Sequence, residues 1–331
     1  WFFSLDLKSS KKIIQSIILK WIEKNLKYSS ENWEFDLTSK RIIAWLSNHN
    51  LTYEEINDDY QNKFNMMVQK QANHLKNIIK NSKLSDDNII GCAAIILVGL
   101  CYKNDKNYLS FGLNHLKKIT NFTLDNQGFP KSRSIKQLIL NLKYFILIRE
   151  WFKEAQITVP EQINETIYYL GQGYAFVWQN IKSDILFNGN NVSNNFEFDN
   201  YLKRFGYNFK NENIEYGGYA ILKNKKTLLA MDIGNSPNRH FSMDYQSGAM
   251  SFEIFSNGKK LICNCGYYQN KNVKLKQLSK TTATHSTLII DNSSSCKFKK
   301  IDRKNFILDN DLKILKKKII FEKNYWKIQA S

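Results

Sequence analysis

Proline and long apolar runs are what this sequence has least of. Three of its 331 residues are proline and fourteen are glycine, which excludes collagen-like and low-complexity disordered chains. The longest apolar segment runs from Ile89 to Leu100. It is shorter than the roughly 18 residues that a membrane-spanning helix needs. We therefore predict no transmembrane segment.

Paired-cysteine motifs are also absent. The sequence has five cysteines, and no two of them have Cys-x-x-Cys spacing. Cys263 and Cys265 would lie on the same face of a strand, which is a poor geometry for a mutual disulfide. We expect the cysteines to serve mainly as small apolar residues, and they do not decide the cellular compartment. The five are Cys92, Cys101, Cys263, Cys265 and Cys296.

Acidic residues are the scarcer charged type. Lys and Arg outnumber Asp and Glu by 48 to 30, which gives a formal net charge of +18. Such an excess favours an acidic partner such as nucleic acid, anionic lipid or an anionic polysaccharide. A general bias of the coding sequence towards Lys, Asn and Ile explains it equally well. Because no zinc-finger, Walker or RNP motif occurs, nucleic acid is not predicted as a partner.

The first 180 residues show helical periodicity. Apolar residues recur at spacings of three and four, as in Ile14, Ile18 and Ile22, which is typical of amphipathic helices. This spacing alone is compatible with a helical bundle or with an α/α toroid. The expected helices cover residues 9–28, 38–48, 54–82, 87–103, 107–120, 133–155 and 160–179.

The rest of the chain has the pattern of short strands. Turn signals follow each other every eight to twelve residues or so, which favours an antiparallel sandwich. We place the change between residues 185 and 198, so that a helical domain covers 1–185 and a β-domain covers 198–331. The expected strands are 199–206, 217–223, 226–233, 249–255, 260–264, 286–291, 297–301, 303–308, 312–322 and 325–329.

Residues 240–292 are the most informative stretch. Ser256-Asn257-Gly258 separates two apolar alternating segments and has the composition of a hairpin turn. A third segment, 286–291, follows a long polar excursion and begins just after His285. Three strands in one sheet would bring Gln246, Asn264 and His285 close together, and a site could lie there.

Several segments resemble the heparinase II/III family of polysaccharide lyases. The resemblance rests on GAMSFEIFSNG at 248–258, LICNCG at 261–266 and TTATHSTLIID at 281–291. Upstream, DNQGFPKSRS at 125–134 and LFNG at 186–189 are similar to two further segments of the family. The order and the spacing of these segments also match.

The resemblance implies a fold and a cellular location. The family combines an N-terminal α/α toroid with a C-terminal antiparallel β-sandwich. Here we expect an incomplete toroid and a truncated sandwich, because both ends of the sequence look cut and family members are longer. The family also implies the periplasm or cell envelope of a bacterium.

The activity implied by the resemblance is β-elimination on an acidic, uronic-acid-containing glycan. The reaction needs a group that neutralises the sugar carboxylate, a base and an acid. His285, Tyr245 and His240 are the candidate catalytic residues. For His285 the alternative is a buried histidine hydrogen-bonded by Asn264 or Gln246. For Tyr245 it is a packed tyrosine, and for His240 a surface loop.

Five residues are candidates for substrate binding. Arg133 could hold a sugar carboxylate through two parallel hydrogen bonds. The alternative is an arginine with a local carboxylate partner. Asn188 could contact substrate or form an ordinary Asn-Gly turn, and Tyr219 could lie on a strand facing the cleft. The other two are Gln246 and Asn264.

No metal or other cofactor is predicted. Characterised family members often bind zinc at three positions, which in this sequence are Gln246, Asn264 and His285. Only His285 is a usual zinc ligand, because amide oxygens are rare ligands of this metal.

Two functions remain open at this level. The first is a polysaccharide lyase acting on an acidic polysaccharide or oligosaccharide. The second is a carbohydrate-binding or cell-envelope protein that kept the fold with altered catalysis. The sequence gives neither the sugar nor the oligomeric state.

Overall fold

A computed structural model of the chain describes residues 10–102, 106–179, 181–193, 195–270, 272–302, 305–322 and 325–330. It contains two compact units. The first comprises residues 1–122 and 143–164, and the second residues 123–142 and 165–331. The change from helices to strands does not coincide with these limits, and the domain boundaries inferred from sequence stay a prediction.

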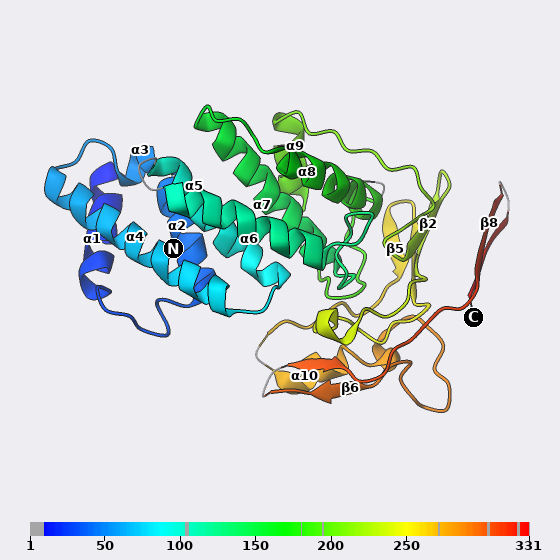
Figure 1. The fold of residues 1–331 in the computed structure, drawn as a ribbon. Helices are drawn as coiled ribbons and strands as arrows, with labels where there is room; N and C mark the ends of the chain where they lie inside the picture. Colours follow the sequence, from blue (N-terminus) through cyan, green and yellow to red (C-terminus); the bar gives the residue numbers. More distant parts are fainter. Residues whose placement is uncertain are drawn as a thin grey trace. The chain divides into compact units, whose positions relative to one another are not determined.

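Helices dominate the N-terminal half, as expected (Figure 1). The helix formed by Ile89–Cys101 is buried at every position from 89 to 100. Its apolar run is thus explained by burial inside a helical layer. No helix of the described residues is long and apolar enough to cross a membrane. The helices are α1 (Lys11–Lys24), α2 (Phe35–Leu46), α3 (His49–Thr52), α4 (Asp58–Asn81), α5 (Ile89–Cys101), α6 (Lys106–Thr123), α7 (Ile135–Glu154) and α8 (Glu161–Tyr174).

A five-stranded antiparallel sheet forms the centre of the second unit. Its strands follow chain order, so each pairs with the next one in sequence. The expected hairpin turn is confirmed, because Asn257 and Gly258 both adopt the positive φ that a tight two-residue turn requires. The strands are β1 (Glu215–Tyr216), β2 (Tyr219–Lys223), β3 (Thr227–Asp232), β4 (Phe252–Ser256) and β5 (Lys259–Ile262).

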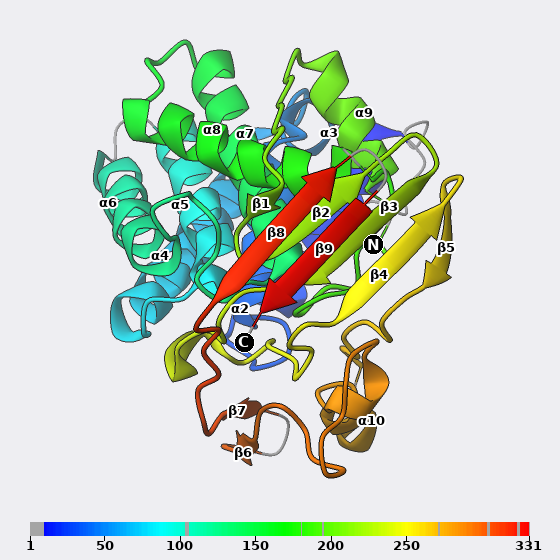
Figure 2. The same cartoon turned by 90° about the vertical axis from the view of Figure 1, so that its right-hand side faces the viewer.

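Two further hairpins follow the sheet. The first pairs β6 (Phe298–Lys300) with β7 (Phe306–Leu308), and the second pairs β8 (Lys317–Glu322) with β9 (Tyr325–Ala330). In Figure 2 the β8–β9 hairpin lies in front of β2 and β3, and in Figure 1 it forms a separate layer. The predicted order of helices followed by antiparallel sheets is therefore confirmed.

Two predicted strands are wrong. Residues 199–206 fall in a helix, α9 (Phe196–Arg204). There Phe198 and Leu202 lie four residues apart and are buried, and Asp199 pairs with Lys203 at 2.7 Å. The alternation of aromatic residues in this segment fits helical spacing as well as strand spacing.

Residues 286–291 form no strand. The segment makes one backbone bond to the sheet, from Phe252 N–H to the Ser286 carbonyl at 3.1 Å. Beyond it, Leu288 and Ile290 are 77% and 66% exposed. The β-branched composition of the segment favours a strand. Among the described residues, however, no neighbouring strand pairs with it.

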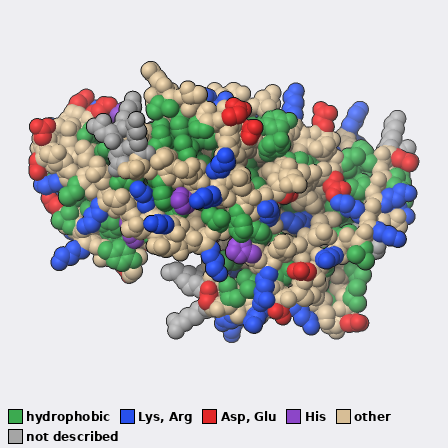
Figure 3. Space-filling model, in the orientation of Figure 1, with side chains coloured by type: hydrophobic (Ala, Val, Ile, Leu, Met, Phe, Trp, Pro, Cys, Tyr) green, Lys and Arg blue, Asp and Glu red, His purple; other side chains and the backbone are tan. Residues whose placement is uncertain are grey.

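Basic residues are dispersed over the face of the molecule drawn in Figure 3. Figure 3 shows Lys and Arg side chains spread across the visible face and interspersed with acidic ones. Several form ion pairs, such as Lys63–Asp59 at 2.6 Å and Lys260–Glu253 at 3.1 Å. This face has no single basic stripe of the kind that typically follows a nucleic-acid backbone.

Candidate functional site: a buried ion pair beside a polar pocket

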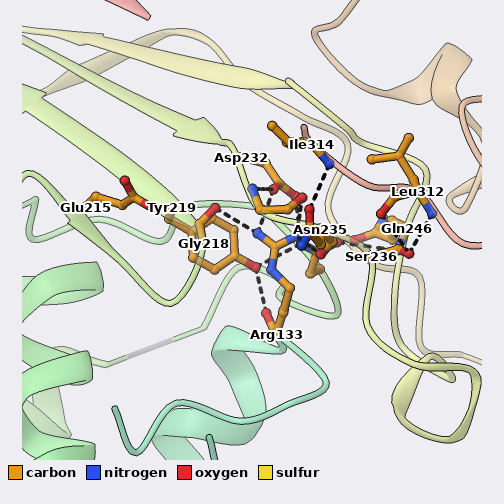
Figure 4. Close-up of polar contacts among 12 residues, drawn as sticks. Arg133, Glu215, Gly218, Tyr219, Asp232, Asn235, Ser236, Gln246, Leu312 and Ile314 are labelled. Atoms are coloured by element: carbon orange, nitrogen blue, oxygen red, sulfur yellow. Dashed lines mark hydrogen bonds and ion pairs between the residues drawn. The ribbon is translucent and has the colours of Figure 1, made fainter. Parts of the chain in front are cut away.

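The candidate site is organised around an ion pair between Arg133 and Asp232. Arg133 lies in the loop that precedes α7, and Asp232 is the last residue of β3. One guanidinium nitrogen donates to the Asp232 carboxylate at 2.6 Å, and the two side chains are 10% and 1% exposed. Figure 4 shows Arg133 reaching from its loop to the end of the strands. The structure thus gives Arg133 a carboxylate partner, which comes from the end of β3 and not from the local sequence.

Three backbone carbonyls surround the same guanidinium. Arg133 donates to the carbonyl oxygens of Gly218, Asn235 and Gly234 at 2.9, 3.0 and 3.3 Å. A Cβ atom on Gly218 or on Gly234 would come within 2.8 or 2.6 Å of guanidinium atoms. The two glycines are therefore required for the backbone to approach the charge so closely.

The charges of the pair depend on each other. Burial has the largest single effect and lowers the pKa of Arg133. The charge and hydrogen bond of Asp232, together with Tyr219 and Tyr245, outweigh it, and the net pKa is raised. Breaking a buried pair by removing one partner typically costs about 3–5 kcal/mol, because it leaves an uncompensated charge. Arg133 has little freedom to exchange Asp232 for a substrate carboxylate, and its role as a substrate contact stays a prediction.

Asn188 and Tyr219 belong to the same buried network. The Asn188 amide donates to the Asp232 carboxylate and to the Tyr219 hydroxyl, both at 2.8 Å. That hydroxyl donates in turn to the Arg133 carbonyl at 2.6 Å. Asn188 is 2% exposed and Tyr219 is fully buried. Both side chains hold the ion pair in place, and their contact with substrate stays a prediction.

Gln246 links the network to the loop that follows α10 (Val273–Leu278). Its amide nitrogen donates to the carbonyls of Ser279 and Gly266 at 2.7 and 3.1 Å, and its oxygen accepts from Gly189 N–H at 3.2 Å. The residue is fully buried. All of these partners are backbone groups, so Gln246 joins three loops.

Asn264 and His285 lie close to Gln246, as predicted. The Asn264 oxygen accepts from Ser286 N–H at 2.9 Å, directly after His285. The backbone of Ser279, to which Gln246 donates, also interacts with the imidazole. The expectation that Gln246 or Asn264 satisfies the ring is wrong. Gln246 is saturated by backbone groups, and His285 Nε2 and Asn264 Nδ2 have no partner among the described residues.

Burial makes His285 a neutral imidazole at physiological pH. It lowers the pKa of the ring to about 4, although the Ser279 backbone and the Asp232 charge oppose this shift. An imidazole with an unpaired Nε2 is chemically suited to accept a proton. Nε2 is shielded from solvent, however, so a substrate would reach it only after a local rearrangement.

The other two candidate catalytic residues are Tyr245 and His240. Tyr245 lies beneath the surface, and His240 lies apart from this arrangement. Tyr245 is fully buried against Cys296 and Leu308. Burial raises the pKa of its hydroxyl, so the hydroxyl stays protonated. His240 lies in an exposed 3₁₀ turn, with its ring 5.1 Å from that of Phe241. It occupies the surface loop that the sequence offered as the alternative.

Sequence reasoning missed three charged residues that the fold buries here. Asp232 was visible only as an acidic residue at the end of an apolar strand. Glu253 is fully buried and accepts from the N–H groups of Leu186 and Asn264 at 3.2 and 2.9 Å. Lys280 is 1% exposed and donates to the Met243 and Tyr245 carbonyls, each at 2.7 Å.

A polar pocket of about 320 Å³ adjoins the ion pair. Its volume is near the lower end of the range typical of small-molecule sites. It is built entirely from loops of the second compact unit. The lining residues are Asp125, Pro130, Lys131, Arg133, Gly217, Gly218, Gly234, Asn235, Ser236, Pro237, Asn238 and Phe241.

The donors at the family's zinc positions do not fit that metal. The amide oxygens of Gln246 and Asn264 already accept backbone N–H groups, and amides are rare zinc ligands in any case. Within the described ranges, no three His, Cys, Asp or Glu side chains cluster as metal ligands would. That the protein works without a cofactor stays a prediction.

Comparison with known proteins decides the family of the strand-rich part. Residues 209–330, which contain every strand described above, match the family model "Heparinase II/III-like, C-terminal". Residues 209–330 are a heparinase II/III-like C-terminal domain. The heparinase-like domain supplies Asp232, Gln246, Asn264 and His285, whereas Arg133 and Asn188 come from preceding segments.

Solved structures extend the likeness in fold to the helices. The crystal structure of heparinase III matches with a TM-score of 0.70 and 16% identity, over 91% of this chain and 55% of the other. A heparan sulfate lyase from Pedobacter heparinus matches with a TM-score of 0.62 and 16% identity, over 90% and 53%. The chain thus spans about half the length of these enzymes. No curated protein matches the sequence.

Proposed function

We propose that this heparinase-like chain is part of a polysaccharide lyase that cleaves an acidic, uronic-acid-containing glycan by β-elimination. The match of residues 209–330 to the heparinase II/III-like C-terminal domain carries the proposal. The similarity of the fold to a heparinase and to a heparan sulfate lyase supports it. An acidic polysaccharide as partner, and the periplasm or cell envelope as location, belong to the same proposal.

The protonation states in the site suit an elimination. The reaction removes the proton next to the sugar carboxylate and expels the glycosidic oxygen. His285 is neutral at pH 7 and is the proposed base, although burial lowers its pKa to about 4 and so makes it a weaker proton acceptor. Tyr245 keeps its proton and is the proposed acid, although burial raises its pKa and so makes it a weaker proton donor. Proton transfer of this kind typically contributes about 10²–10⁴-fold in rate.

A second function is favoured by one specific observation. Five of the candidate residues, Tyr219, Tyr245, Gln246, Asn188 and Asn264, are at most 2% exposed. Their polar groups mainly stabilise loops, and contact with substrate would require the loops to open. A carbohydrate-binding or cell-envelope protein that retained the lyase fold agrees with this burial.

One experiment separates the two functions. The full chain is incubated with a panel of uronic-acid polymers, and the absorbance of the unsaturated uronate product is followed over time. The lyase proposal expects a signal on at least one polymer, reduced at least about tenfold in His285→Gln, which has no titratable base. His240→Gln tests the exposed histidine in parallel, and its effect decides whether that residue is catalytic.

The outcomes are distinct. Absence of product on every polymer, together with measurable glycan binding, would contradict the lyase and support the binding protein. Full activity in His285→Gln would remove His285 from the mechanism. A circular dichroism melt of each variant shows whether a loss of activity reflects unfolding.

A further inference from the structure

The polar pocket beside Arg133 has almost no net charge. Three of its lining residues are ionisable: Asp125, Lys131 and Arg133. Arg133 is neutralised by Asp232 at 2.6 Å. Asp125 and Lys131 carry single opposite charges. The Asp125 carboxylate accepts hydrogen bonds from the N–H groups of Gln127 and Phe129, both at 2.8 Å. The charges at the pocket therefore sum to zero, although the chain as a whole carries +18.

Basic residues near this site have acidic partners too. Lys317, whose pKa is lowered by burial and by the Arg133 charge, pairs with Glu215. Arg239 neighbours Phe241 within one 3₁₀ turn and pairs with Asp309 at 3.8 Å. Among the residues that the structure describes, the local excess of positive charge that would attract a carboxylate is therefore missing.

A uronate in this pocket would compete with a buried carboxylate. Asp232 is 1% exposed and also accepts from the Asn188 amide at 2.8 Å. To receive a sugar carboxylate, Arg133 would have to leave Asp232 buried and unpaired. The Asp125 carboxylate at the same pocket would repel the incoming anion and so offset its attraction by Lys131. Both effects discriminate against an acidic sugar at this position.

An uncharged sugar meets suitable groups here. Phe241 contributes a half-buried aromatic ring, and the Lys131 ammonium lies 6.0 Å from the ring centroid. The C–H face of a pyranose can pack against the part of the ring that Lys131 does not cover. Asn238 is exposed, and its amide offers both a donor and an acceptor to hydroxyl groups. An apolar platform with a few polar groups beside it is the usual composition of a small-molecule pocket.

We propose that this pocket is a binding site for an uncharged sugar unit. The inference rests on the proposed function for its ligand class, because that proposal makes a glycan the partner. It adds that the chain recognises a neutral unit of the glycan at this pocket, and that any uronate lies elsewhere.

Pairs of methyl glycosides test the proposal on the full chain. Each pair, with gluco, galacto or manno configuration, differs only at C6, which is a hydroxymethyl group in one member and a carboxylate in the other. Ligand-observed saturation-transfer NMR measures their affinities. We expect at least one neutral glycoside to bind at least tenfold more tightly than its uronide. Phe241→Ala should weaken this binding at least tenfold, and Phe205→Ala, which removes an exposed ring outside the pocket, should leave it unchanged.

A variant that changes a charge and little else gives a binding result that a loss of packing would not produce. Asp125→Asn keeps an oxygen that can accept the two loop N–H groups and removes one negative charge. We expect it to strengthen uronide binding at least threefold while neutral binding is retained. Uronides that bind wild-type protein as tightly as neutral glycosides, no binding of any neutral glycoside, or no effect of Phe241→Ala would each overturn the proposal. A negative polymer-cleavage assay with positive glycoside binding would contradict the proposed elimination alone.

Discussion

At the scale of single residues, Asp232 is the residue on which the site depends. It receives hydrogen bonds from Arg133 and Asn188, at 2.6 and 2.8 Å, and from Gly234 N–H at 3.2 Å. These three donors come from three different loops. One carboxylate at the end of β3 therefore fixes the segments that surround the polar pocket.

Substitution of Asp232 by asparagine should be strongly destabilising. The variant leaves the Arg133 charge buried without a counter-charge, which typically costs about 3–5 kcal/mol in free energy of unfolding. Asp309→Asn is the matched control. Its pair with Arg239 is more than half exposed on both sides, and such pairs contribute about 0–1 kcal/mol. Urea unfolding measures both, and equal costs would contradict the buried-pair account.

Lys280 should make stability depend on pH. Burial lowers its pKa from 10.5 to about 7, while Asp244 raises it and Lys276 lowers it further. Between pH 7 and pH 10.5 the unfolded chain keeps a proton that the folded chain releases. Stability therefore rises with pH in this window, by at most about 1.4 kcal/mol per pH unit.

The measurement compares the free energy of unfolding at pH 7, 8 and 9. The advantage of wild-type protein over Lys280→Met should grow with pH, because the variant has no proton to release. Lys225→Met, which changes an exposed lysine in the turn between β2 and β3, should follow wild-type protein. A constant difference between wild-type protein and Lys280→Met would show that Lys280 is not titrating in this range.

At the scale of elements, the same residue types serve as core in one place and as surface in another. Leu222, in β2, is 1% exposed, whereas Leu288, in the segment that resembles a strand, is 77% exposed. The difference comes from pairing. β2 lies between two strands of the sheet, while residues 286–291 have a single backbone bond to it.

Identical leucine-to-alanine changes should reveal this difference. Leu222→Ala removes buried methyl groups and should lower the free energy of unfolding by about 2–5 kcal/mol. Leu288→Ala should change it by less than about 0.5 kcal/mol, as is usual for exposed positions. Chemical denaturation measures both. A large cost for Leu288→Ala would mean that segment 286–291 is packed in a way that the structure does not describe.

At the scale of the whole molecule, charge and specificity are separate properties. A net charge of +18 attracts any polyanion, yet the charge on the face shown in Figure 3 is dispersed and the polar pocket is neutral. Attraction between exposed charges is screened over about 10 Å at 0.1 M salt. Attraction of polyanions by the surface should therefore depend on salt, and sugar binding in the pocket should not.

Binding at two salt concentrations separates these contributions. Between 50 and 300 mM NaCl, the affinity for heparin and for duplex DNA should fall at least tenfold, by release of counterions. The affinity for a neutral methyl glycoside should stay within about twofold, because no charge is involved. Fluorescence anisotropy and saturation-transfer NMR supply the values. Salt-independent binding of DNA would contradict our prediction that nucleic acid is not a specific partner.

Local pattern was sufficient for most elements. The 3.6-residue spacing placed α1, α2 and α4 to α8, and the Asn257-Gly258 turn placed the β4–β5 hairpin, because each signal depends on residues near in sequence. The short helix α3 lies between two predicted helices and was not predicted. Local sequence pattern gave the wrong structure for α9 and for segment 286–291. In both cases the composition suits a strand, and the structure that the segment adopts depends on neighbours distant in sequence.

The site was predictable only in part. The convergence of Gln246, Asn264 and His285 followed from their places at the ends of expected strands and from the resemblance to heparinase II/III. The partner of Arg133 did not, because Asp232 lies 99 residues away and nothing in its local sequence distinguishes it. The burial of Lys280 was equally invisible, since a lysine in a polar segment normally lies in solvent.

By itself, the sequence determined that helices come first, that antiparallel strands follow, and that the strand-rich part is heparinase-like. Periodicity, turn chemistry and local motifs carry that information over a few residues. The tertiary structure alone decided that Arg133 faces Asp232, that the polar candidates are buried and that the adjoining pocket is neutral. Charge pairing and burial arise between distant segments, so only the folded chain specifies them.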